Sequence, residues 1–186
     1  DERGVTLDAH PPTLRDALFW AEGRTVLELD VKRGVSYEEV ARAVRSAGAL
    51  YSVVFVTYSV DGAARLARVA PEAMMYVTVE SERDLNELER RGVVLSHVVA
   101  WTGIDEPNSV LNVALAARGV EARFGTLGGS DSWDARFARE QGEQYAAFAD
   151  TGLAIIATDR PVEASSDLDT HRGAEDVAAM QCTSAQ

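Results

Sequence analysis

Short apolar segments alternate with amphipathic segments along this chain, and a glycine commonly separates a helix-like segment from the strand-like segment after it. Strands that alternate with helices at this spacing are typical of parallel βαβ units, so the pattern predicts an α/β protein. The expected strands cover residues 26–32, 52–58, 74–79, 93–101, 120–127 and 153–158. The expected helices cover residues 13–22, 36–47, 62–69, 81–90, 107–117 and 133–149.

About six such strands fit either an open doubly wound sheet or most of a (β/α)8 TIM barrel, which is commonly about 250 residues long. No Gly-x-Gly-x-x-Gly motif follows the first expected strand, so a dinucleotide-binding sheet has no support. We expect residues 1–164 to form the folded domain. Residues 165–186 are polar and rich in small residues, and we expect them to be a peripheral tail.

The composition excludes several classes of partner. The formal net charge of −12 opposes binding to nucleic acids and to anionic membrane surfaces. No apolar run approaches the roughly 20 residues that a membrane-spanning helix needs. Cys182 is the single cysteine, which excludes an intrachain disulfide and a cysteine metal cluster, and the sequence does not fix the cellular compartment.

The first expected strand, residues 26–32, carries charges at alternate positions. Because successive side chains of a strand point to opposite faces, Glu28, Asp30 and Lys32 are expected to share one face and the apolar residues the other. Asp30 and Lys32 suit an oxygen-ligated Mg²⁺ or Ca²⁺ beside a phosphate, and an internal salt bridge is the alternative. Glu28 is expected to have a structural role in which it binds Lys32 or a neighbouring strand. The alternative is that Glu28 contacts and orients a residue that binds the cation.

Other candidates follow from the rule that the working groups of such barrels stand at the C-terminal ends of the strands. Besides Asp30 and Lys32, the rule selects the following residues: Thr57, Tyr58, Thr78, Glu80, Trp101, Thr102, Thr126, Thr158 and Asp159. Trp101 is expected either to stack over a ligand or to belong to the core. Asp159 is expected to cap backbone amides in a turn. His10 and His97 have no partners at the spacing of a metal site or a catalytic triad.

Several motifs occur in an order that resembles glycerophosphodiester phosphodiesterases. Pro-Thr-Leu at 12–14 opens a helix, Gly23 follows, and Leu-Asp-Val-Lys at 29–32 is similar to that family's acid-x-Lys strand. The strand and helix over residues 54–71 and the Thr-Asp-Arg-Pro sequence at 158–161 are similar to later parts of the family. The resemblance covers residues 11–162 and implies a (β/α)8 barrel of which the last six strands are present and the first two are missing.

The resemblance also implies roles for individual residues. Asp30 would be a ligand of a divalent cation, Mg²⁺ or Ca²⁺, at a position where the family usually has glutamate. Lys32 would contact the phosphate of the substrate, and Thr126 would line the substrate site. The family often has Trp-Thr where this chain has Gly125 and Thr126, so the stacking contact would be lost or supplied by Trp101.

The implied activity is metal-assisted hydrolysis of a small glycerophosphodiester to glycerol 3-phosphate and an alcohol. The family's catalytic histidines and further acidic ligands belong to strands that have no counterpart here, so the catalytic residues are unknown and this chain alone would be incomplete. We therefore expect a partner, either the missing N-terminal segment or a second copy of the chain. The alternatives are a catalytically silent barrel remnant that binds a ligand or partner, and a different α/β enzyme closed by self-association.

Overall fold

Six parallel strands form one sheet, in the order of the sequence, in a computed structural model that describes residues 10–140 and 142–171. The strands are β1 (Leu27–Asp30), β2 (Val53–Val56), β3 (Met74–Thr78), β4 (Val98–Trp101), β5 (Glu121–Gly125) and β6 (Ile155–Ala157). The helices are α1 (Leu14–Ala21), α2 (Tyr37–Ser46), α3 (Val60–Val69), α4 (Glu82–Arg90), α5 (Ser109–Ala117), α6 (Trp133–Glu140) and α7 (Tyr145–Ala149), and Leu50–Ser52 and Leu95–His97 are short 3-10 turns.

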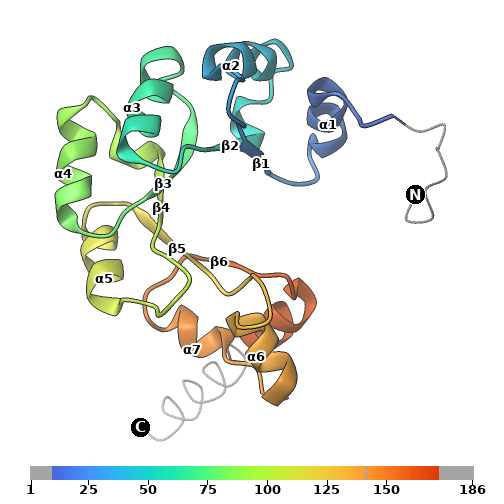
Figure 1. Cartoon of the computed structure of the whole chain (residues 1–186), viewed down its shortest axis with the longest axis vertical. Coiled ribbons are helices and arrows are strands. Elements are labelled where there is room, and N and C mark those ends of the chain that lie inside the picture. The colour runs from blue at the N-terminus through green and yellow to red at the C-terminus, as the bar shows by residue number, and fades with distance from the viewer. Residues whose placement is uncertain (1–9, 141, 172–186) are drawn as a thin grey trace, which may run out of the picture.

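The sheet curls into a half-barrel, with the strands along the inside of an arc and the helices along its outside (Figure 1). This arrangement confirms the predicted α/β class. The architecture is of the barrel type, because a doubly wound sheet would have helices on both of its faces. Within the described sheet, β1 pairs only with β2 and β6 pairs only with β5. Each of these end strands therefore has one edge that the described residues leave unpaired.

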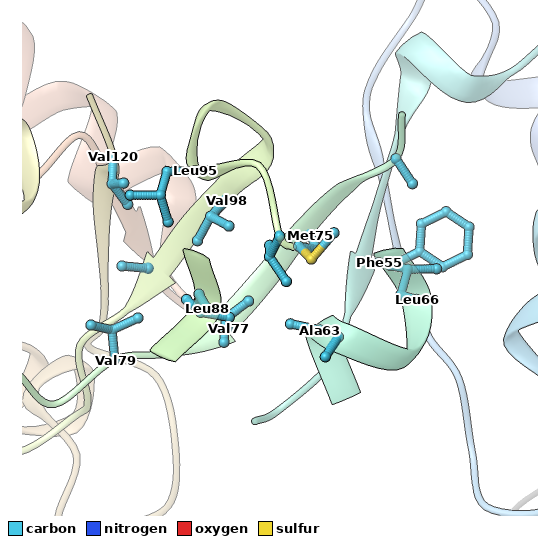
Figure 2. Close-up of a cluster of buried hydrophobic side chains, with 14 of the residues drawn as sticks. Phe55, Ala63, Leu66, Met75, Val77, Val79, Leu88, Leu95, Val98 and Val120 are labelled. Atoms are coloured by element: carbon cyan, nitrogen blue, oxygen red, sulfur yellow. The ribbon is translucent and has the colours of Figure 1, made fainter. Parts of the chain in front are cut away.

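The main core lies between the outer face of the sheet and the helices. Outward-facing Phe55, Met75 and Val77 pack against helical residues such as Leu66 and Leu88, and all of them are almost fully buried (Figure 2). Burying one such side chain contributes roughly 1.5–3 kcal/mol of hydrophobic free energy. This packing fixes which face of each strand points into the concave side of the half-barrel.

The expected single helix over residues 133–149 is wrong, because α6 ends at Glu140 and α7 begins at Tyr145. Gly142 lies in the break, and glycine is a weak helix former. The break turns Tyr145 back onto α6, where its ring lies 5.0 Å from that of Phe137 in an edge-to-face contact. Aromatic packing in a second core cluster therefore overrides helical periodicity here.

Other boundaries moved by smaller amounts. The expected strand 93–101 begins only at Val98, after the 3-10 turn, and α3 begins at Val60 because the Ser59 hydroxyl accepts a hydrogen bond from the Gly62 amide. Thr13 and Asp16 form a capping box at the start of α1.

The expected boundary between domain and tail at residue 164 falls inside a helix. Residues 161–171 are helical, Ala164 is buried in the second core cluster, and the Ala146 amide donates to the Asp167 carboxylate over 2.9 Å. The folded part therefore continues to residue 171, and the rest of the predicted tail, with Cys182, lies outside the described residues. No described helix has the length and apolar character to cross a membrane.

Candidate functional site

The inner face of β1 carries the predicted row of charges. Glu28 and Asp30 lie on this concave face with side chains 44% and 36% exposed, whereas Leu27 and Leu29 pack against the main core. The strand ends at Asp30, so Lys32 belongs to the loop that follows. The alternation predicted from the sequence therefore holds within the strand, and the loop brings Lys32 to the same place.

Asp30 and Lys32 form an ion pair at the C-terminal end of β1. The hydrogen bond from Lys32, and next the one from the Tyr58 hydroxyl, hold the pKa of the Asp30 carboxyl below its usual value. The same contact raises the pKa of Lys32. Tyr58 has a φ of 60°, a left-handed conformation that is uncommon for residues other than glycine. The structure thus shows the salt bridge that was the alternative for this pair, at the edge where a barrel enzyme places its chemistry.

The described residues do not by themselves make a cation site. Mg²⁺ and Ca²⁺ take about six or more oxygen ligands, of which proteins commonly supply several. In the described ranges, no group of three or more His, Cys, Asp and Glu side chains is placed to hold a metal ion. Asp30 offers one exposed carboxylate, already paired with Lys32.

A pocket of about 320 Å³ opens on the concave face beside this pair. It is lined by Glu28, Val56, Tyr58, Tyr76, Thr78, Trp101, Arg123 and Leu127. Its size falls at the lower end of the range for small-molecule sites, and a wall of apolar and aromatic side chains with a few polar groups is typical of them.

Arg123 is the central charged residue of the pocket, and the sequence analysis missed it. It lies in the middle of β5 with its side chain 11% exposed, and its Nη1 donates to Glu28 Oε2 over 2.9 Å. The Tyr76 hydroxyl lies 3.4 Å from Glu28 Oε1, and burial is the main cause that raises the pKa of Tyr76. Glu28 therefore pairs with a residue of β5, which is not a neighbour of β1. The sequence had predicted a contact of Glu28 with Lys32 or with a neighbouring strand.

The guanidinium of Arg123 also lies against two aromatic rings. Its central carbon is 4.1 Å from the centre of the Tyr76 ring and 5.5 Å from that of Trp101. Such contacts are favourable because the ring faces are electron-rich. The sequence did contain a signal for Arg123, because a cation in the middle of an apolar strand needs a partner. The strand-end rule missed it because that rule considers only residues at the ends of strands.

Trp101 occupies the space where a side chain of residue 125 would stand. A Cβ atom built on Gly125 would lie 2.5 Å from Trp101 Cη2 and 2.9 Å from Ile104 Cγ2. The indole is half-buried and lines the pocket, so Trp101 is not a simple core residue. The indole thus stands where a side chain of residue 125 would, and the stacking contact that was expected to be either lost or supplied by Trp101 stays a prediction.

Three further candidates lie away from the pocket. Thr126 is fully buried and its hydroxyl donates to the Ala157 carbonyl over 3.2 Å, which argues against the predicted substrate contact. Asp159 accepts a hydrogen bond from the Gly128 amide, so the predicted capping role is confirmed. His97 is half-buried, with Nδ1 2.9 Å from the Pro71 carbonyl.

Comparison with known proteins finds solved structures that this chain resembles. No family model and no curated protein matches the sequence. A glycerophosphoryl diester phosphodiesterase from Parabacteroides distasonis ATCC 8503 matches with a TM-score of 0.72 and 25% identity, over 86% of this chain and 55% of that one. A glycerophosphodiester phosphodiesterase from the same organism matches in fold, with a TM-score of 0.61, 16% identity, and coverage of 87% and 65%. This chain thus spans little more than half the length of the first, and the predicted resemblance to glycerophosphodiester phosphodiesterases is confirmed.

Proposed function

We propose that this half-barrel is the larger part of an enzyme that hydrolyses glycerophosphodiesters to glycerol 3-phosphate and an alcohol. The observation that carries the proposal is the match to a glycerophosphoryl diester phosphodiesterase over 86% of the chain. The ion pair of Asp30 and Lys32 supports it, because it lies at the C-terminal end of a parallel strand, where barrel enzymes place their reacting groups.

Each member of the pair has a distinct role in this proposal. The Lys32 ammonium, 76% exposed, is a mobile point charge that would leave Asp30 to contact phosphate oxygens of a bound diester. Asp30 would contribute one ligand to Mg²⁺ or Ca²⁺, which when bound stabilises negative charge on the phosphate. The remaining ligands and the acid and base would come from residues outside the described part of the chain or from another polypeptide.

Release of glycerol 3-phosphate tests this function in the complete gene product. The substrates are glycerophosphoglycerol and glycerophosphocholine, each with Mg²⁺, with Ca²⁺, or with a chelator. Asp30→Asn removes the negative charge and is expected to lower kcat/KM at least about 100-fold, an effect of about 2.7 kcal/mol on the barrier. Glu39→Gln, an exposed acid on α2, is the matched control and should keep the wild-type rate. An unchanged rate in Asp30→Asn would eliminate the cation role.

The second candidate is a binding module without catalysis. It is favoured by the pocket itself, which is lined by eight described residues of this chain. Calorimetric titration of the 186-residue chain with a glycerophosphodiester separates the two. Binding by the chain with no turnover by the complete gene product would support the binding module, whereas turnover that needs a cation would support the enzyme.

A further inference from the structure

Two of the three aromatic side chains that line the pocket already hold a cation. Tyr76 and Trp101 both lie within 5.5 Å of the Arg123 guanidinium carbon, measured to their ring centres. In proteins that bind quaternary ammonium ligands, the ligand itself takes this place over the rings. Here a side chain of the protein takes that place.

Arg123 is also held firmly. Its side chain is 11% exposed, and Glu28 binds it through a 2.9 Å ion pair from the opposite end of the sheet. The Gly125 position leaves room for the Trp101 indole and so fixes one aromatic wall. A ligand cation would therefore have to displace this buried, paired guanidinium from the two ring faces.

We propose that Arg123 sets the alcohol specificity of the site by excluding diesters of cationic alcohols, such as choline, and admitting diesters of uncharged polyols. This inference rests on the proposed function, since it names the substrate class of the same site. Hydroxyl groups suit the pocket, because the Glu28 carboxylate accepts hydrogen bonds, the guanidinium donates them and the Tyr58 hydroxyl does both. The opposite charges of Glu28 and Arg123 leave their pair neutral, which matches an uncharged group.

The proposal predicts a switch of specificity when Arg123 is removed. In Arg123→Met the Tyr76 and Trp101 faces are freed of the guanidinium, and the Glu28 carboxylate loses its cation. The freed ring faces of Tyr76 and Trp101, with the ring of Tyr58 in the same pocket and an unpaired Glu28 carboxylate, together suit a trimethylammonium group. Arg123→Met should therefore gain affinity for glycerophosphocholine, a gain that loss of folding cannot produce.

Isothermal titration calorimetry of the chain in a chelator measures this without turnover. We expect wild-type protein to bind glycerophosphoglycerol at least tenfold more tightly than glycerophosphocholine, a difference of about 1.4 kcal/mol. Arg123→Met should bind glycerophosphocholine at least tenfold more tightly than wild type does. Arg123→Lys keeps a cation and should still discriminate against glycerophosphocholine. Arg42→Met, an exposed arginine on α2, is the control and should bind both diesters as wild type does.

Three results would overturn the inference. They are equal affinity of the wild type for the two diesters, no detectable binding of either, and an Arg123→Met variant that loses affinity for both while its circular dichroism melt stays cooperative. Failure of the proposed function is seen separately. A complete gene product that releases no glycerol 3-phosphate, with the binding preference intact, would remove the hydrolase and leave the assignment of Arg123.

Discussion

Replacing Gly125 by alanine should destabilise the protein, because the added methyl group would collide with the pocket wall. The new Cβ would lie 2.5 Å from Trp101 Cη2, 2.9 Å from Ile104 Cγ2 and 3.1 Å from Trp101 Cζ2. Ordinary carbon contacts are about 3.5–4.0 Å. The indole would have to move by about 1 Å, and its position beside Arg123 would change with it.

The size of the effect is the difference of two terms. Overpacking of this kind costs about 1–3 kcal/mol. Gly→Ala also restricts the unfolded chain, which returns about 0.4–1 kcal/mol. We expect Gly125→Ala to lower the free energy of unfolding by about 1–2 kcal/mol and the Tm by roughly 2–8 °C for a chain of this size.

Urea denaturation followed by circular dichroism measures the change, and Gly129 offers a matched control. A Cβ on Gly129 meets no atom within 4 Å, so Gly129→Ala should leave the midpoint within the error or raise it. In a Trp101→Ala background two of the three close contacts of Gly125→Ala are gone. In that background Gly125→Ala should lower the free energy of unfolding by only about 0.5 kcal/mol or less. The difference from its effect in the wild type is a coupling energy of about 1 kcal/mol between residues 101 and 125.

Two outcomes would refute this account of Gly125. One is a Gly125→Ala variant as stable as wild type. The other is an equal loss of stability in the Trp101→Ala background, because the strain would then arise from Ile104 or the strand backbone and not from the indole.

Two further predictions concern titration. Burial raises the pKa of Tyr145 to about 12, so its contribution to stability is full below its usual pKa of 10.0 and falls as the pH rises toward 12. Tyr145→Phe should lower the free energy of unfolding by about 1–3 kcal/mol, because it removes the 2.9 Å hydrogen bond to buried Asp134. In urea titrations at pH 9 to 12, this variant should also show a smaller fall of stability with pH than the wild type does. In carbon-13 NMR the Asp30 carboxyl should titrate with a pKa below its usual 3.8, since Lys32 and Tyr58 stabilise its charged form. Its ion pair with Lys32 should be complete above pH 3.8 and lost as the pH falls through the lowered pKa. Lys32→Met should return the midpoint toward 3.8.

The sequence predicted the course of the chain better than its interior contacts. All six strands lie within the ranges expected from apolar, β-branched runs bounded by glycines, because outward-facing residues such as Phe55 and Val77 must be buried under helices. The helix over residues 133–149 was wrong, since its periodicity carries no information on the aromatic contact that turns Tyr145 back onto Phe137.

The same division holds for the site. Asp30 and Lys32 could be paired from the sequence because they are two residues apart at the end of one strand. The partner of Glu28 could not, because Arg123 is brought to it only by the curvature of the sheet. A rule that reads each strand end separately finds neighbours along the chain and misses contacts across a barrel.

The ion pair between Glu28 and Arg123 joins two strands that are not neighbours in the sheet. Glu28 is on β1 and Arg123 is on β5, so the contact spans the concave face with β2, β3 and β4 between them. Removing Glu28 would leave a mostly buried guanidinium without its carboxylate, which is costly. The ion pair therefore joins two strands across the curved sheet with side chains that also line the pocket. Under the proposed function these described residues would contribute to ligand recognition and the reacting groups would include others, so ligand binding and turnover should be separable by experiment.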